Sequence, residues 1–258
     1  MRSTVLVYRD YGVGDLTNLM RGLKAYFKPY AITVGCTDAA SILKENALNE
    51  DVFCFVMPGG AATPYLEKLK IQGNQKIREY IKQGGHYLGI CAGAYYACSR
   101  VEFETDIKPL SIIREHELLD LVDVSAVGTL HKELDIKPYM KNEASAATVK
   151  LEWMEDHELH YAHYHGGPKF VSDNQKFEVL ARYADLKSAP AAIIAQTFGK
   201  GRVVLSGVHF EDRGQDLEKA LHAFRLDLKD ASRIADVLRK NELSRKMLFN
   251  KIMSSFLR

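Results

Sequence analysis

Short apolar runs separated by amphipathic segments mark the first ninety residues of the chain. The runs are rich in β-branched and aromatic residues, which predicts buried strands at 4–8, 31–34, 52–57 and 87–90. Apolar residues recur every three or four positions between them, which predicts helices at 15–27, 41–48 and 76–82. Strands that alternate with helices predict a doubly wound, mostly parallel sheet of the flavodoxin-like α/β class.

The second half of the chain has a less regular pattern. Between about 103 and 148 the period is lost, which predicts a β-rich insertion. Strands are predicted at 147–151, 159–165, 177–183, 191–198 and 202–206, and the last two form a hairpin around Gly199-Lys200-Gly201. From Asp216 on, Leu217, Leu221, Phe224 and Leu228 predict an amphipathic helix, and a second one is predicted over 234–249. We therefore expect an α/β domain at 1–215 and a C-terminal helical extension at 216–258.

Composition and charge indicate the cellular location of the protein and the kinds of partner to expect. The 258 residues carry a net charge of +2 without a concentrated basic stripe before the C-terminal tail, which gives no reason to expect nucleic-acid binding. The four cysteines form no C-x-x-C pair, which favours reduced thiols over disulfides or a zinc site. No signal peptide and no run of about 18 apolar residues is found, so we expect a cytoplasmic protein without a membrane span.

The sharpest chemical signal is Gly89-Ile90-Cys91-Ala92-Gly93, which joins the predicted strand 87–90 to a predicted helix at 92–99. A G-x-C-x-G elbow of this kind projects its side chain from a tight turn at a helix N-terminus. Such a position favours a thiolate, and the Ala92 N–H could stabilise an oxyanion. A small buried cysteine in a Gly/Ala-rich helix start is the alternative.

Two further features fit a cysteine nucleophile. His209 and Glu211 follow a predicted strand two residues apart, so they can point the same way as base and orienting acid. Pro58-Gly59-Gly60 ends another strand, where glycine N–H groups can serve an oxyanion hole. A surface His-Glu pair and an ordinary tight turn are the alternatives.

In this order, PGG, GICAG and HFE resemble the class I glutamine amidotransferase-like superfamily. VMPGGA at 56–61, GICAGAYY at 89–96 and HYHGGP at 163–168 are similar to the N-terminal domain of eukaryotic-type biotin-protein ligase. The resemblance covers about residues 1–215. It implies that Cys91 is the nucleophile, His209 the base and Glu211 the orienting acid, and that Gly60 and Ala92 are the oxyanion donors.

Two departures from these families limit what the resemblance implies. Members that hydrolyse glutamine carry a Gln soon after the elbow, and Tyr95 stands there, which argues against simple glutamine as the substrate. The HPE signature of the superfamily is His209-Phe210-Glu211, which keeps the catalytic pair. The ligase catalytic domain has no counterpart in the motifs, so the sequence does not predict biotin ligase activity for this chain alone.

Several other residues are candidates for contact with a small-molecule or peptide amide substrate. They are Asp10, Gly59, Tyr95, Tyr96, His165, Gly166 and Gly167. The histidines at 157, 160, 163 and 165 are interpreted as loop or pocket-lining residues rather than metal ligands, and no metal or cofactor is expected. The C-terminal helices have an apolar face that packs on the domain or, as a second hypothesis, binds a protein partner.

Two functions fit these observations. The first is a Cys-His-Glu amidase or amidotransferase-like hydrolase that acts on an amide other than simple glutamine. The second is a non-catalytic binding or regulatory domain that keeps the fold.

Overall fold

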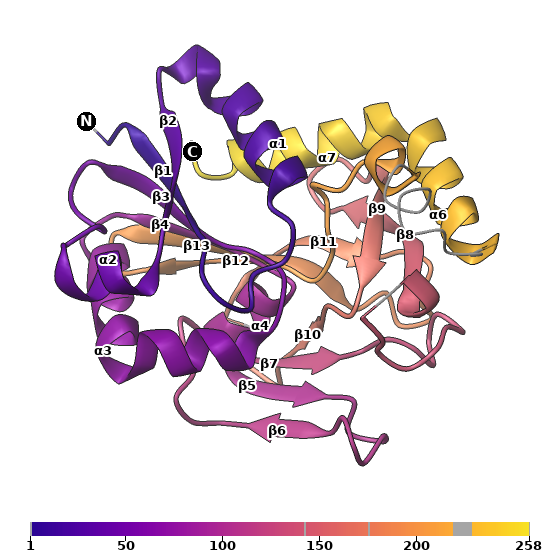
Figure 1. The fold of residues 1–258 in the computed structure, drawn as a ribbon. Coiled ribbons are helices and arrows are strands. Elements are labelled where there is room, and N and C mark those ends of the chain that lie inside the picture. The colour runs from indigo at the N-terminus through magenta and orange to yellow at the C-terminus, as the bar shows by residue number, and fades with distance from the viewer. Residues whose placement is uncertain (1, 142, 175, 219–228, 258) are drawn as a thin grey trace.

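The computed structural model describes residues 2–141, 143–174, 176–218 and 229–257, and shows one large sheet with helices on both faces (Figure 1). The strands are β1 (Thr4–Tyr8), β2 (Thr33–Thr37), β3 (Val52–Met57), β4 (His86–Ile90), β5 (Cys98–Phe103), β6 (Ile112–Arg114), β7 (Val122–Gly128), β8 (Ala146–Trp153), β9 (Leu159–His165), β10 (Lys169–Val171), β11 (Glu178–Tyr183), β12 (Ala191–Phe198) and β13 (Gly201–Ser206). The helices are α1 (Thr17–Phe27), α2 (Ala39–Lys44), α3 (Ala62–Lys82), α4 (Ala92–Ala97), α6 (Lys229–Lys240) and α7 (Glu242–Ser254), with 3₁₀ turns at Lys28–Tyr30 and Glu143–Ser145.

The sheet has a parallel half and a mainly antiparallel half. The parallel strands lie in the order β2-β1-β3-β4-β13. The path continues through β12, β10, β7, β5 and β6, while β11, β8 and β9 extend from β12. Of these pairings, β5 with β7 is parallel and the others are antiparallel. The predicted α/β class, with its β-rich insertion, is confirmed.

Alternate residues of the central strands pack against different helical layers. Val7 of β1 belongs to the core cluster that contains Leu23 of α1 and Phe249 of α7. Tyr8, the next residue, belongs to the cluster that contains Ile77 of α3. Because successive side chains of a strand point to opposite faces, both faces of the parallel half are buried. This explains why its strands are continuous apolar runs in the sequence.

Some predicted boundaries are wrong. Helix α3 begins at Ala62 rather than at 76, and its helical period is interrupted by Lys70, whose φ of 54° and ψ of −172° are not helical. Helix α4 ends at Ala97 because Cys98 already pairs with Val122 of β7. The short strand β10 was not predicted, since its three residues form a strand only by pairing with neighbours on both sides.

The C-terminal region also differs from its prediction. The helix expected from Asp216 lies largely outside the described residues, which include 214–218 as helix and then resume at 229. The single helix expected over 234–249 is two helices, α6 and α7, separated at Asn241. Figure 1 shows α7 in yellow beside α1, and its Leu248, Phe249 and Ile252 are buried in the core cluster of β1 and α1. The boundary at 215 therefore does not separate two cores.

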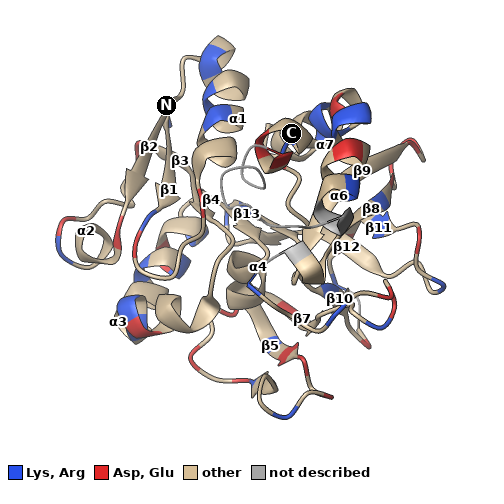
Figure 2. Ribbon diagram, turned by 45° about the vertical axis from the view of Figure 1, so that its right-hand side comes forward, with Lys and Arg blue, Asp and Glu red and all other residues tan. Residues whose placement is uncertain are grey.

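Charged residues of both signs share the same elements. Figure 2 shows Lys, Arg, Asp and Glu positions side by side on α3 and on α7. Among the described residues, no helix combines the length and the apolar character needed to cross a membrane.

His86 gives the fold an acid-sensitive element. Its Nδ1 accepts a hydrogen bond from the Arg202 amide at 3.1 Å, and burial together with the charges of Arg2 and Arg202 lowers its pKa to about 4. The unfolded chain binds this proton near pH 6.5, so the folded state loses up to about 3 kcal/mol as pH falls from about 6.5 to 4. His86→Asn keeps an acceptor but does not titrate, and we expect its urea-unfolding free energy to fall less over this range. Equal slopes for both chains would contradict the assignment.

Candidate active site

The pairing of β13 with β4 brings the elbow and the candidate base together. Ser206 lies beside Ile90 in the parallel register, and the Cys91 amide donates to the Ser206 carbonyl at 2.9 Å. His209 follows Ser206 by three residues, so both segments leave the sheet at the carboxyl ends of adjacent strands. In open α/β sheets this is the edge at which ligands bind.

Cys91 lies on a strained elbow. Its φ of 48° and ψ of −104° are unusual for a residue with a side chain, and helix α4 begins at the next residue. A Cβ at Gly93 would lie 2.0 Å from the Met57 carbonyl oxygen, and one at Gly89 would lie 2.6 Å from the Gly93 carbonyl oxygen. The two glycines therefore let the turn close, and the Cys91 side chain is held above the sheet, 7% exposed.

The imidazole of His209 is oriented by its neighbours. Its Nδ1 donates to Glu211 Oε1 at 2.8 Å, which leaves Nε2 as the ring nitrogen available to a thiol, and both His209 and Cys91 line the same pocket. The Cys91 thiol itself donates to the His165 carbonyl at 3.5 Å. The His209 amide donates to the His163 carbonyl at 2.8 Å. The Ser206 hydroxyl braces the turn before it by accepting from the Val208 amide at 3.2 Å and donating to its carbonyl at 2.8 Å.

The charges around His209 favour its protonated form. Burial alone would lower the pKa of His209, but the charges of Glu211 and Cys91 and the hydrogen bond to Glu211 raise it well above its usual value. An imidazolium next to the sulfur stabilises a thiolate, which is the nucleophilic form of cysteine. The arrangement can therefore hold a reactive thiolate with a proton donor beside it.

The backbone amides of Gly60 and Ala92 are the predicted oxyanion donors. The hydrogen bonds from Gly14 to the Gly59 carbonyl (3.0 Å) and from Ala61 to the Gly12 carbonyl (2.8 Å) flank Gly60 and do not use its amide. The Ala92 amide is the first of α4. No backbone acceptor for either amide is found within the described part of the chain. Their role as oxyanion donors stays a prediction.

A pocket of about 360 Å³ opens over Cys91. Six of the residues that the sequence proposes for catalysis, the oxyanion hole or substrate contact line it, namely Gly59, Gly60, Cys91, His165, His209 and Glu211. The sequence argument did not include six polar or charged residues that also line it, namely Asp15, Asn18, Tyr139, Lys141, Asp212 and Arg213. The adjacency of Asp212 to Glu211 was the one sequence signal that could have indicated any of them.

A second imidazole–carboxylate pair lies beside the first. His163 Nδ1 and Asp212 Oδ2 are 2.7 Å apart, and the His163 ring is 5.9 Å from the ring of His209 and 6.1 Å from that of His165. Burial would raise the pKa of Asp212, but the hydrogen bond and charge of His163 and the charge of His209 lower it to about 2. The interpretation of His163 and His165 as pocket-lining residues on one strand face agrees with this placement.

The two tyrosines after the elbow do not line the pocket. The Tyr95 hydroxyl donates to the Gly166 carbonyl at 3.2 Å, and the Tyr96 hydroxyl bonds to Asn74 Oδ1. Tyr96 is fully buried and Tyr95 is 4% exposed. Both side chains pack inside the domain, because the short helix α4 is buried on all sides. Neither tyrosine lines the pocket over Cys91, and contact of either one with substrate stays a prediction.

Three other candidates hold neighbouring segments of the chain together and do not form the wall of the pocket. They are Asp10, Gly166 and Gly167. Asp10 accepts hydrogen bonds from the amides of Tyr11 at 2.7 Å and Ala39 at 3.3 Å, which ties the end of β1 to the start of α2. The Gly167 carbonyl accepts from the Tyr164 hydroxyl at 2.9 Å. None of the three lines the pocket over Cys91, and their direct contact with substrate stays a prediction.

Two groups of neighbouring His, Asp and Glu side chains were considered as metal ligands, and neither is evidence for a metal site. In the described ranges, Glu104, Asp106 and His131 lie close enough to share an ion, but His131 already bridges the two carboxylates and Lys132 pairs with Asp106 at 2.6 Å. The group His209, Glu211 and Asp212 is likewise engaged in the hydrogen bonds described above. The expectation of no metal or cofactor stays a prediction.

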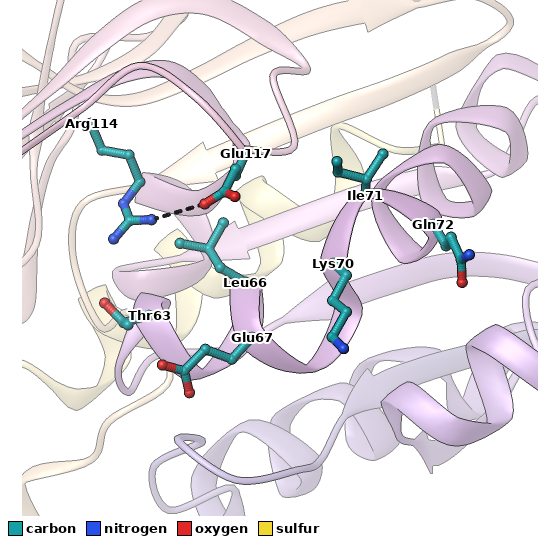
Figure 3. Close-up of a pocket in the computed structure, with 8 residues that line it drawn as sticks. All are labelled: Thr63, Leu66, Glu67, Lys70, Ile71, Gln72, Arg114 and Glu117. Atoms are coloured by element: carbon teal, nitrogen blue, oxygen red, sulfur yellow. Dashed lines mark ion pairs between the residues drawn. The ribbon is translucent and has the colours of Figure 1, made fainter.

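A separate hollow of about 800 Å³ lies between the kinked helix α3 and the segment that carries Arg114 and Glu117 (Figure 3). Arg114 and Glu117 form an ion pair at 3.6 Å across one side of it, and Lys70 stands at the kink. None of its lining residues lines the pocket over Cys91. It is therefore distinct from the candidate active site.

Comparisons with known proteins agree with this architecture. Residues 3–257 match the family model described as biotin-protein ligase, N terminal. An uncharacterized protein of Chlamydia muridarum is 32% identical over 80% of each chain. Biotin–protein ligase of Schizosaccharomyces pombe is 29% identical over 87% of this chain, which spans only 36% of that protein. The crystal structure of a Thermotoga maritima glutamine amidotransferase superposes with a TM-score of 0.61 at 16% identity, covering 100% and 99% of the two chains, and shows a shared fold.

Proposed function

Because the chain belongs to the family of biotin-protein ligase N-terminal domains and has a glutamine amidotransferase-like fold, we propose that it is a cysteine-dependent amidase or amide transferase with Cys91 as the nucleophile. One observation carries the proposal. Cys91 stands on an elbow and lines the same pocket as His209, whose ring Glu211 orients through a hydrogen bond of 2.8 Å. Nucleophile, base and orienting acid are the three parts that acyl transfer by cysteine requires.

The reaction proceeds through a thioester. The Cys91 thiolate attacks the amide carbonyl carbon, and the carbonyl π electrons move to the oxygen, which receives hydrogen bonds from the Gly60 and Ala92 amides. The His209 imidazolium gives its proton to the amide nitrogen as the C–N bond breaks and the amine leaves. Water or an amine then attacks the thioester, neutral His209 takes the proton of this nucleophile, and the thiolate is expelled.

The substrate is an amide of a small molecule or short peptide. A volume of about 360 Å³ falls in the range of pockets that hold small ligands, about 300–1,000 Å³. Tyr95 stands where glutamine-hydrolysing relatives carry a Gln, and its hydroxyl is bound to Gly166 rather than directed to the pocket. We therefore propose an amide other than simple glutamine. Biotin ligation, the activity after which the much longer Schizosaccharomyces pombe protein is named, is not part of the proposal.

Selective alkylation of the wild-type chain tests the nucleophile. At about pH 6 an ordinary thiol near pKa 8.5 is almost wholly protonated, whereas a thiolate paired with imidazolium is not. We expect chloroacetamide to label Cys91 before the exposed Cys36, although Cys91 is buried, with the sites identified by peptide mass spectrometry. Cys54 and Cys98 are buried internal references, since burial raises the pKa of each thiol.

The outcome separates the two functions. Labelling of Cys36 ahead of Cys91 would favour a non-catalytic binding or regulatory domain that keeps the fold. If Cys91 is labelled first, a screen of small amides and peptides, with the Cys91→Ala chain as the blank, identifies the substrate. If the wild-type and Cys91→Ala chains turn over these substrates equally, Cys91 is not the nucleophile and the proposed enzyme function is wrong.

A further inference from the structure

Helix α7 reaches the segment that carries the candidate base and acid. We propose that Arg245 of α7 is a positioning residue for His209 and Glu211, so that the C-terminal helix is part of the active-site architecture. This inference rests on the proposed function. It assigns a role to a region that the sequence indicated only as a packed or partner-binding helix.

The Arg245 guanidinium joins α7 to the backbone of residues 210 and 211. Nη1 donates to the Phe210 carbonyl at 2.7 Å and to the Glu211 carbonyl at 3.5 Å. Nε and Nη2 pair with the two carboxylate oxygens of Glu242, one turn earlier, at 2.9 and 2.7 Å. Arg245 is 6% exposed, so the paired carboxylate balances a buried charge while Nη1 remains directed at the loop.

The loop needs such an anchor because its own hydrogen bonds are few. Phe210 and Glu211 follow β13 and are buried, so their carbonyls require donors from elsewhere in the protein. Glu211 Oε1 bonds to His209, whereas Oε2 is buried and has no hydrogen-bond partner among the described residues. No hydrogen bond at Oε2 therefore fixes the Glu211 carboxylate. The position of the Glu211 backbone decides whether Oε1 reaches His209.

A second contact between α7 and the loop involves Phe210. This residue stands where the superfamily signature has proline, whose ring would restrict the backbone by itself. The Phe210 ring instead meets the Phe249 ring edge-on, with centroids 5.4 Å apart. Phe249 and Arg245 lie four residues apart, on neighbouring turns of the same helix face. The helix thus holds the loop by one polar and one aromatic contact.

Loss of the Arg245 contact has a predictable effect on Cys91. If residues 210 and 211 shift, the hydrogen bond between Glu211 and His209 lengthens and the imidazolium loses its nearest counter-charge. The imidazolium then supports the thiolate less well, and Cys91 behaves more like a free thiol. A merely structural role for Arg245 would lower stability without this change in the pH profile of Cys91.

The test is the rate of Cys91 alkylation by iodoacetamide as a function of pH, in chains checked by circular dichroism. For Arg245→Met we expect at least a tenfold loss of rate at about pH 6 and less than about a threefold loss above pH 9, where any thiol ionises. Arg245→Lys keeps the charge but cannot pair with Glu242 and bridge both carbonyls, so we expect at least about a threefold loss at pH 6. Lys246→Met is the matched control, because it removes an exposed positive charge from the neighbouring position, and its profile should follow the wild type.

Each outcome decides the question. A folded Arg245→Met or Arg245→Lys chain with the wild-type profile overturns the positioning role and leaves the proposed function standing. If Arg245→Met does not fold, the Arg245→Lys profile alone decides. A wild-type chain in which Cys91 titrates as an ordinary thiol overturns the proposed function, and the positioning role with it.

Discussion

His209→Asn is expected to lower the rate of Cys91 acylation near neutral pH by about 10²–10⁴-fold, the range typical of a lost general acid–base group. Asparagine can still donate to Glu211, so the local hydrogen bond survives while the titrating imidazole is lost. The pKa of the wild-type His209 imidazolium is raised, mainly by the charge of Glu211, so the proposed mechanism has a protonated imidazole beside Cys91 near neutral pH. In the variant, the reactive form should appear only as pH rises toward about 8.5.

The measurement is the pH profile of acylation by an activated amide or ester, followed by mass spectrometry of the acyl-enzyme. His157→Asn serves as the control, because His157 is exposed, pairs with Glu152 at 2.7 Å and does not line the pocket. It should keep the wild-type profile. A His209→Asn chain that acylates within about threefold of the wild type at neutral pH would show that His209 is not the base.

Gly59→Ala is expected to reduce the same rate by about 10²-fold, because displacement of a catalytic group by about 1 Å can have this effect. A Cβ at Gly59 would lie 2.5 Å from His209 Cε1, closer than two carbon atoms can approach without a shift. Glu211 holds the other side of the ring at Nδ1, so the ring can relieve the overlap only by tilting relative to Cys91. The main effect should therefore be on acylation rather than on folding.

Gly14→Ala is the matched control for this prediction. Gly14 lines the same pocket, and a Cβ there would meet the Gly59 carbonyl oxygen at 3.5 Å, an ordinary contact. Acylation rates and thermal midpoints are to be compared for the three chains. If the acylation rate falls equally in the two variants, the cause is a general disturbance of the pocket rather than a displaced His209 ring.

Much of the fold follows from local pattern. The strands at 4–8, 52–57, 159–165 and 191–198 were predicted at the observed boundaries, since buried strands require continuous or alternating apolar residues. The boundaries that failed belong to elements whose ends depend on partners. Cys98 leaves the helical pattern only because β7 pairs with it, and α3 extends well before the predicted start.

The residues of the candidate site likewise include some that local sequence predicts and some that it does not. The elbow was predictable, because Gly89 and Gly93 are required by backbone approaches within a few residues of Cys91 or on the adjacent strand β3. The position of Tyr95 was not, because the sequence marks the residue type but not the direction of its side chain. Asp212 was missed because its significance comes from His163, 49 residues away in the chain.

The sequence by itself determined the alternation of strands and helices, the G-x-C-x-G elbow and the order of Cys91, His209 and Glu211, because each depends on residues close together in the chain. Only the tertiary structure decided that β13 lies beside β4, so that His209 meets a thiol 118 positions earlier in the numbering. It also decided that Arg245 reaches the loop after β13. Such contacts arise from sheet order and helix packing, which are set by burial summed over the whole domain rather than by any one segment.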